Sequence, residues 1–209
     1  MKNLTLVDHP VLHRSVAALR RRETPPRAFR EELHRSSIFL VAEALRRVRT
    51  ARVRLETPLE PAMGVEFDEE IVLVPVLRAG LTMVDASLTL VPDARVGHVG
   101  LYRDEATHHP VDYYLRLPTN LAESHVLILD PMLATGGSAV RSVDELLEAG
   151  ARHIQLVCLI AAPEGVRRMA ESHPDVRIIA AALDRGLDEN AFIRPGLGDA
   201  GDRAYGTGR

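Results

Sequence analysis

A glycine-rich segment that follows an apolar run carries the clearest chemical signal in the sequence. The run 125–130, HVLILD, ends in the carboxylate of Asp130, and PMLATGGSAV follows it. The glycine pair 136–137 begins a helical pattern instead of ending one, so the amides of the preceding turn can face an anion at a helix N-terminus. Thr135 and Ser138 add hydroxyl donors. The segment predicts a phosphate monoester site in which Asp130 reaches sugar hydroxyls, and a tight turn that needs small residues is the alternative.

Two arginines stand at the ends of other apolar runs. Arg78 follows the run 71–77, and Arg103 follows the run 95–102. Two guanidinium groups aimed at one ligand edge would suit a diphosphate. A buried ion pair at Arg78 and a plain surface turn after Arg103 are the alternatives. The adjacent histidines at 108–109 are not expected to bind a metal, because neighbouring side chains point apart.

The basic residues narrow the chemistry further. Of the 26 Lys and Arg residues, only Lys2 is a lysine. This nearly excludes a Schiff-base lysine and a Walker-type lysine after a glycine loop. Residues 130–138 also match neither the dinucleotide pattern GxGxxG nor the triphosphate pattern GxxxxGK[ST]. Any phosphate must therefore be held by backbone amides, hydroxyl groups or arginines.

The elements that position these residues follow from the hydrophobic pattern. Short, almost wholly apolar runs predict strands covered on both faces, at 71–77, 95–102, 125–130, 154–160 and 176–183. Helical patterns lie between several of them, at 80–91, 137–150 and 163–173, and Gly150 suits a helix C-terminus. This alternation implies an α/β fold with a parallel sheet and right-handed crossovers. Ligands bind beyond the carboxyl ends of such strands, where Asp130, Arg78 and Arg103 stand.

The whole chain, 1–209, suits a single domain with one substantial core. Helical patterns at 9–22 and 25–50 fill most of its beginning. Three regions are expected: an N-terminal helical region over 1–55, a core over 70–182 and a C-terminal hood over 183–209.

The glycine-rich segment 193–207 of the hood predicts backbone without regular structure. Ile193, Leu197 and Tyr205 argue against a floppy tail, and Asp199 stands beside a glycine. Such a segment suits a loop whose backbone approaches a ligand closely.

Composition favours a cytoplasmic globular protein. The net charge of −3 gives no reason to expect a nucleic-acid or membrane partner. Cys158 lies in the apolar run QLVCLIAA, where a buried thiol fits better than a nucleophile. The N-terminus lacks a secretory apolar core, and no apolar run approaches the roughly 20 residues that a bilayer requires. Arginines at 20–22 and 46–54 could suggest an RNA patch, but solvated helix and strand faces are the preferred interpretation.

These motifs together resemble the uracil phosphoribosyltransferase family. DPMLATGGS is similar to that family's binding loop for 5-phosphoribosyl 1-diphosphate, and LRAGL, GLYRDE, AAPEG, HPDV and PGLGDAGDRAYGT match in order and spacing. The resemblance extends over nearly the whole chain. It implies the phosphoribosyltransferase type I fold, with a parallel β-sheet flanked by helices. It also implies conversion of uracil and phosphoribosyl diphosphate to UMP and diphosphate in pyrimidine salvage.

The resemblance assigns roles to individual residues. Asp130, Arg78, Arg103 and Asp199 are the expected catalytic residues. Binding of phosphoribosyl diphosphate is expected at Arg78, Arg103, Asp130, Pro131, Met132, Leu133, Ala134, Thr135, Gly136, Gly137, Ser138 and Asp199. Binding of uracil is expected at Ile193, Gly198, Asp199 and Ala200. Mg²⁺ is the expected cofactor, carried on the diphosphate without direct protein ligands, and the family suggests GTP as an activator and a homo-oligomer, a dimer or tetramer.

Two positions depart from the family pattern. Arg194 stands where the family usually has an aliphatic residue, which puts the packing of the base loop in question, and Ala42 stands where a tyrosine is frequent. Two alternative functions also stay open. One is a pyrimidine-responsive RNA-binding regulator on the same fold, and the other is a phosphoribosyltransferase for another base.

Overall fold

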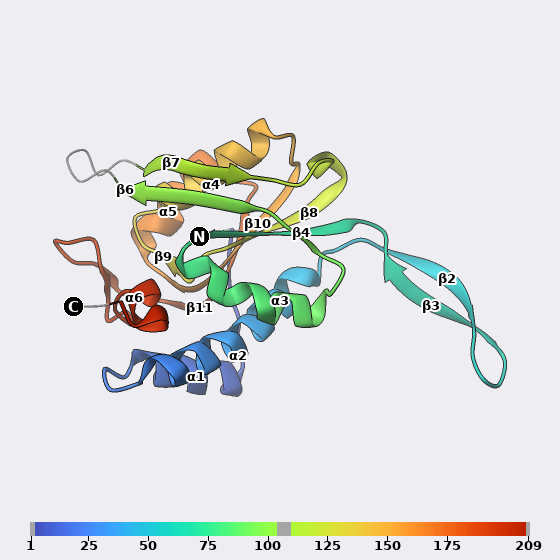
Figure 1. The fold of residues 1–209 in the computed structure, drawn as a ribbon, viewed down its shortest axis with the longest axis horizontal. Coiled ribbons are helices and arrows are strands. Elements are labelled where there is room, and N and C mark those ends of the chain that lie inside the picture. The colour runs from blue at the N-terminus through green and yellow to red at the C-terminus, as the bar shows by residue number, and fades with distance from the viewer. Residues whose placement is uncertain (1–2, 104–109, 208–209) are drawn as a thin grey trace.

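A parallel sheet forms the centre of the molecule. The computed structural model describes residues 3–103 and 110–207, apart from the side chains at 101–103 and 110–113. In spatial order the main strands are β1 (Leu4–Leu6), β11 (Arg177–Leu183), β10 (His153–Ala161), β8 (Ser124–Leu129), β4 (Glu70–Leu77), β6 (His98–Arg103) and β7 (Pro110–Arg116). Two short strands pair beside this path, β5 (Arg95–Val96) with β4 and β9 (Met132–Leu133) with β10. The pairing is parallel throughout except between β6 and β7, which are antiparallel (Figure 1).

The apolar runs at 71–77, 125–130 and 154–160 form buried strands, as predicted, whereas the run 95–102 is divided between β5 and β6. Every residue of β8 is buried, and β4 and β10 are buried over most of their length. Successive side chains of a strand point to opposite faces, and β8 follows this rule: Leu127 and Leu129 join one core cluster, while Val126 and Ile128 join the other. The sheet therefore separates two hydrophobic layers.

Helices cover both faces of the sheet (Figure 1). On one face lie α1 (Pro10–Arg20), α2 (Pro26–Leu45), the 3₁₀ turn η1 (Ala79–Met83) and α3 (Val84–Leu90). On the other lie α4 (Gly137–Glu148) and α5 (Pro163–Ser172), with a further 3₁₀ turn, η2 (Leu121–Glu123), before β8. The predicted end of α4 is confirmed, because Gly150 adopts a φ of 93° and its N–H bonds the carbonyl of Leu147 at 3.0 Å. Within the described ranges, no helix has the length and apolarity to cross a membrane.

The region 1–55, expected to be helical, also contains two strands. β1 pairs with β11 at the edge of the central sheet. β2 (Thr50–Glu56) pairs antiparallel with β3 (Pro61–Phe67), and this hairpin extends away from the body of the molecule (Figure 1). We call it the arm. Residues 52–56, RVRLE, alternate charged and apolar side chains, and this period of two favours a strand over a helix.

The hood is more regular than its glycine content predicts. It contains β12 (Gly186–Leu187), paired antiparallel with β13 (Ile193–Arg194), and α6 (Ala200–Tyr205). The prediction of wholly irregular backbone over 193–207 is therefore wrong. Asp199 begins α6 by accepting a hydrogen bond from the amide of Asp202 at 2.8 Å, and Gly206 ends it in the left-handed conformation.

Candidate active site

A cleft of about 290 Å³ opens where the loop after β8 meets the hood. It brings together seven residues that the sequence singled out, namely Asp130, Met132, Ala134, Ile193, Gly198, Asp199 and Ala200. Ala79 from η1 also lines it. Residues more than sixty positions apart in the chain thus share one small cavity at the carboxyl end of the parallel sheet.

Asp130 occupies the first position after β8. Its amide donates to the carbonyl of Val157 at 3.1 Å, which continues the sheet pairing by one residue. Its Oδ1 accepts a bond from the amide of Met132 at 3.3 Å. Burial raises the pKa of the carboxyl to about 7, and the Met132 hydrogen bond offsets only part of that effect. A carboxylate with so little hydration favours a ligand that brings hydroxyl donors.

The start of α4 follows this carboxylate in the chain and has the form of an anion-binding turn. Gly136, at φ 79°, precedes the twelve-residue helix, and Thr135 Oγ1 accepts from the amide of Gly137 at 3.4 Å. Ser138 lies in the first turn. A helix start of this kind concentrates amide donors and partial positive charge, which suits a phosphate.

The loop between β8 and α4 contributes backbone more than side chains. Pro131 and Leu133 are buried, and Leu133 packs in the core beneath α4. Close packing against α5 fixes the loop: a Cβ added to Gly165 would lie 2.5 Å from the carbonyl oxygen of Ala134. Met132 and Ala134 are the loop residues that line the cleft.

Arg78 follows β4 and enters η1. A Cβ on Gly80 would lie 2.2 Å from the carbonyl oxygen of Leu129, so only glycine lets this turn pack against the end of β8. The Arg78 side chain is exposed, with Nη2 3.4 Å from Asp202 Oδ1. The alternative of a buried ion pair is therefore wrong. Arg103 ends β6, and its side chain lies outside the described residues.

An ion pair to α1 holds the hood in place, and sequence reasoning missed it. Arg20 donates to Asp184 Oδ2 at 2.8 Å, to Oδ1 at 2.6 Å and to the carbonyl of Gly196 at 2.8 Å. Asp184 also accepts from the amide of Gly196 at 2.8 Å. The solvated-face interpretation of 20–22 is therefore wrong for Arg20. Asp184 directly follows β11, the same placement that marks Asp130, and this signal could have revealed it.

A second arginine connects α6 to the N-terminal helices. Arg203 donates to the carbonyls of Leu197 at 2.7 Å and Arg21 at 2.5 Å, and its guanidinium carbon lies 4.5 Å from the ring centroid of Phe29. The N-terminal helices thus support the loop that carries Gly198 and Asp199.

Four further residues line the cleft that the sequence did not single out, namely Gly201 of α6 and the three residues 190–192. Asn190, Ala191 and Phe192 form the turn between β12 and β13. Ala191 adopts a φ of 63°, a left-handed conformation that is unusual for a residue with a Cβ. The segment GLDENAFIR gave no clear hairpin signal, because no Asn-Gly or Asp-Gly pair marks the turn.

Comparison with known proteins decides the family. Residues 6–207 match the family described as uracil phosphoribosyltransferase. The chain belongs to the uracil phosphoribosyltransferase family. A uracil phosphoribosyltransferase from Salinibacter ruber is 52% identical over 207 residues, covering 99% of both chains. One from Thermus thermophilus is 47% identical over 205 residues, covering 98% of this chain and 99% of its own.

Solved structures agree on the phosphoribosyltransferase type I fold. The AQ2163 protein from Aquifex aeolicus superimposes with a TM-score of 0.92 at 37% identity, covering 97% of each chain. An adenine phosphoribosyltransferase from Leishmania donovani reaches a TM-score of 0.61 at 14% identity, covering 91% of this chain and 88% of its own. The second likeness shows the fold alone.

The two departures from the uracil phosphoribosyltransferase pattern leave the packing intact. Arg194 directs its exposed side chain to Asp188, with Nε 2.8 Å from Oδ2. Its neighbour Ile193 stays buried in the core. Ala42 lies on an exposed position of α2. The unusual arginine thus lies outside the packed surface, and Ile193 keeps its place in the core.

Proposed function

We propose that this protein transfers the phosphoribosyl group of 5-phosphoribosyl 1-diphosphate to uracil, giving UMP and diphosphate in pyrimidine salvage. The observation that carries the proposal is the shared cleft. We call residues 130–138 the phosphate loop; its Asp130 and Ala134 line this cleft together with Ile193, Gly198 and Ala200 of the hood. One cavity thus combines the Asp130 carboxylate and the loop that leads to α4 with hood backbone suited to a flat base.

The phosphoribosyl half fits the end of β8 and the start of α4. Backbone amides and hydroxyls of 133–138 hold the 5-phosphate at the helix N-terminus. Asp130 accepts hydrogen bonds from the ribose hydroxyls. These bonds replace the hydrogen bonds from water that the carboxylate loses on burial. Arg78 and Arg103 bind the diphosphate as cations.

Mg²⁺ is proposed to enter with the diphosphate. Among the residues that the structure describes, no three His, Cys, Asp or Glu side chains converge as a metal site. The carboxylates at the cleft, Asp130 and Asp199, belong to the oxygen donors that Mg²⁺ accepts. Bound Mg²⁺ would neutralise charge on the leaving diphosphate.

The hood reads uracil through its backbone. Uracil presents an acceptor, a donor and an acceptor along O2, N3–H and O4. Backbone N–H and C=O groups around Ile193, Gly198 and Ala200 can answer that pattern. Gly198 adopts a φ of 82°. Because glycine has no side chain, its backbone groups can approach a ligand closely.

The reaction is a displacement at the anomeric carbon. The bond from C1 of the ribose to diphosphate breaks as the bond from a uracil nitrogen to C1 forms, and the transition state has oxocarbenium character. The protein supplies no covalent group. It aligns the two substrates and stabilises the charge that grows on the departing diphosphate.

Competition among bases is the decisive experiment. The value of kcat/KM should be highest for uracil, close to it for 5-fluorouracil, and lower for cytosine by about 10⁴-fold, because cytosine reverses two groups of the recognised edge. Cytosine within tenfold of uracil would refute the backbone readout. Preference for orotate or a purine would assign the protein to another base, and salt-resistant binding of pyrimidine leader RNA on filters would favour the regulatory alternative.

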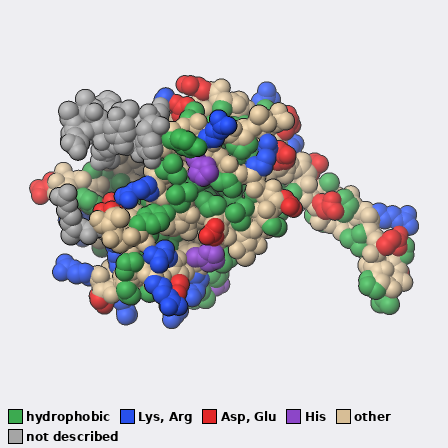
Figure 2. Space-filling view, viewed as in Figure 1, with side chains coloured by type: hydrophobic (Ala, Val, Ile, Leu, Met, Phe, Trp, Pro, Cys, Tyr) green, Lys and Arg blue, Asp and Glu red, His purple; other side chains and the backbone are tan. Residues whose placement is uncertain are grey.

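A homo-oligomer is proposed from the exposed apolar face of the arm. Met63, Val65 and Phe67 follow one another on one face of β3 and are all exposed, and Leu59 at the tip is 95% exposed. Figure 2 shows the arm projecting into solvent with hydrophobic side chains along it. An exposed apolar surface of this kind marks an interface.

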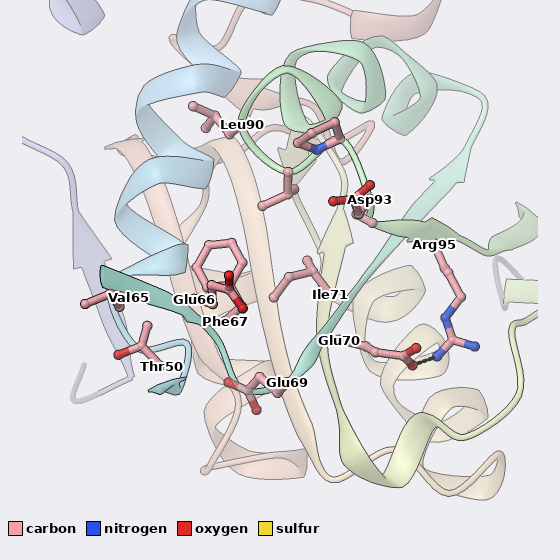
Figure 3. A pocket seen from close by; sticks show the side chains of 13 residues that line it. Thr50, Val65, Glu66, Phe67, Glu69, Glu70, Ile71, Leu90, Asp93 and Arg95 are labelled. Carbon is pink, nitrogen blue, oxygen red and sulfur yellow. Dashed lines mark hydrogen bonds and ion pairs between the residues drawn. The ribbon is translucent and has the colours of Figure 1, made fainter. Parts of the chain in front are cut away.

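The base of the arm adjoins a groove of about 640 Å³. Figure 3 shows Phe67 and Val65 on one wall, with Leu90 of α3 opposite and the Glu70–Arg95 ion pair at one end. Light scattering should show a dimer or tetramer, and Phe67→Ser combined with Met63→Ser should shift it toward the monomer. An unchanged mass would remove the arm from the interface.

Activation by GTP, a cytoplasmic location and the lack of a nucleic-acid or membrane partner complete the proposal. GTP activation rests on the family resemblance, and initial rates with and without GTP test it. The net charge of −3 supports the absence of polyanion partners.

A further inference from the structure

One carboxylate organises the turn that borders the base side of the cleft. Asp188 Oδ1 accepts from the amide of Asn190 at 3.0 Å and from the amide of Phe192 at 2.9 Å. The backbone of Asp188 adds two bonds, from its amide to the carbonyl of Phe192 and from the amide of Ala191 to its carbonyl, both at 2.9 Å. The turn is therefore closed by its own first residue.

The other oxygen of this carboxylate binds Arg194. Asp188 Oδ2 lies 2.8 Å from Nε and 2.5 Å from Nη2 of Arg194, so the guanidinium approaches with two nitrogens. The Asp188 side chain is 15% exposed and that of Arg194 is 58% exposed. The amide of Phe192, followed by Arg194 and Asn190, lowers the pKa of Asp188, so the carboxylate is charged at neutral pH.

The turn needs these contacts because its backbone conformation is intrinsically unfavourable. Ala191 at φ 63° carries a Cβ in the left-handed region, where such residues are disfavoured. Its two neighbours, Asn190 and Phe192, are the residues whose amides Asp188 holds. All three line the cleft together with Ile193. A shift of this turn therefore moves one wall of the base site.

The opposite side of the hairpin is held separately. Glu164 at the start of α5 accepts from the amide of Leu187 at 3.4 Å, and a Cβ on Gly186 would lie 3.0 Å from its Oε1. Arg194 pairs with Gly186 across the two strands. Glu164 thus fixes β12 against the body, which leaves Asp188 and Arg194 to fix the outer turn.

We propose that Asp188 and Arg194 form a latch that positions the 188–193 turn against the nucleobase and so tunes base affinity. The latch rests on the proposed function, because it assigns the hood side of the cleft to uracil. Both are positioning residues: Arg194 acts through Asp188, and Asp188 acts through the backbone of the turn. The phosphoribosyl side of the site, at Asp130 and the start of α4, lies outside the turn.

The test compares four variants in steady-state kinetics with each substrate varied in turn. Arg194→Met keeps the aliphatic stem and removes the charge. It should raise KM for uracil about threefold, as expected for a partly exposed ion pair. Asp188→Ala should raise it about tenfold or more, because two backbone amides lose their partner as well. Arg194→Lys should recover part of the loss, and Asp188→Ala with Arg194→Met should match Asp188→Ala alone.

The matched control removes an exposed ion pair whose residues do not line the cleft. Arg27 and Glu31 form an exposed pair on α2 with Nε 2.9 Å from Oε1, and Arg27→Met should leave both KM values unchanged. KM for phosphoribosyl diphosphate should change less than twofold in every latch variant. The difference in KM for uracil between wild type and Arg194→Met should also decrease at high salt, because salt screens the ion pair.

The outcomes separate the two proposals. An active wild type whose KM for uracil is unchanged by Arg194→Met and Asp188→Ala overturns the latch alone. Equal increases in KM for both substrates, with a lower melting temperature, also overturn it, because the pair would then support only the fold. A wild type inactive with uracil overturns the proposed function and the latch together.

Discussion

Replacing Asp130 with asparagine should make the protein more stable and less active. The carboxyl of Asp130 has its pKa raised by burial from the ordinary 3.8 to about 7. Each tenfold change in proton affinity corresponds to about 1.4 kcal/mol. Keeping the ionised carboxylate in the folded cleft therefore costs about 4 kcal/mol of unfolding free energy above pH 7. Asparagine has similar size, keeps an acceptor for the Met132 amide and never ionises.

The sign of the pH dependence follows from proton binding. Between about pH 4 and pH 7 the folded protein keeps a proton on Asp130 that the unfolded chain has released, so wild-type stability falls as the pH rises through this window. The stability of Asp130→Asn lacks this contribution. The stability advantage of the variant should grow from about 2 kcal/mol near pH 5 to about 4 kcal/mol near pH 8, where it levels off.

Urea unfolding of both proteins without ligand, at about pH 5 and about pH 8, measures the two differences. Kinetics on the same samples should show a higher KM for phosphoribosyl diphosphate, with KM for uracil changed far less, because the ribose hydroxyls lose a charged acceptor. A variant less stable than wild type at both pH values would refute the reasoning. A stability advantage of equal size at both pH values would also refute it. Equal kinetic loss for both substrates would show that Asp130 supports the fold and not the ligand.

Three further predictions concern other parts of the molecule. Arg103→Ala should lower kcat and raise KM for phosphoribosyl diphosphate, a combined loss of about 2–4 kcal/mol in transition-state stabilisation; wild-type kinetics would remove Arg103 from the site. Gly165→Ala places a Cβ 2.5 Å from the Ala134 carbonyl oxygen, so the phosphate loop should shift and KM for phosphoribosyl diphosphate should rise, whereas unchanged kinetics would show that α5 yields instead. Burial lowers the pKa of His125 despite the carboxylate of Glu69, so the unfolded chain takes up a proton first and stability should fall as the pH drops below about 6.5. His125→Gln should flatten that limb in urea unfolding, and a limb that persists unchanged assigns it to another group.

Local patterns predicted the parts of the fold that depend on near neighbours. The buried strands followed from continuous apolar runs, and the end of α4 followed from Gly150, because each depends on residues close in sequence. The turn between β8 and α4 was equally visible, since an acid, hydroxyls and glycines stand together between a strand and a helix. The short helix α6 escaped prediction because a single capping aspartate, Asp199, outweighs its glycine-rich surroundings.

Long-range contacts were beyond any local pattern. Arg20 and Asp184 are separated by 164 positions, and the sequence around one residue does not predict its contact with the other. The arm was missed although residues 52–56 alternate charged and apolar side chains, a local pattern that favours a strand. The Asp188–Arg194 pair shows the same limit at short range. An unusual arginine could be noticed in the sequence, but its partner depended on the turn that brings β13 back beside β12.

The contacts between the two ends of the chain also constrain how the protein can be made. β1 needs β11 as its only described pairing partner in the sheet, and Arg20 needs Asp184 and Gly196. During synthesis, residues 130–138 leave the ribosome well before β11, Asp184 and Gly196. A ribosome-bound chain can therefore form the middle of the sheet before β1 and Arg20 have their partners. The hood half of the cleft is completed last, because residues 190–201 lie near the end of the chain. Pairings so distant in sequence form slowly, so the loop that follows β8 is expected to fold before the hood side of the cleft.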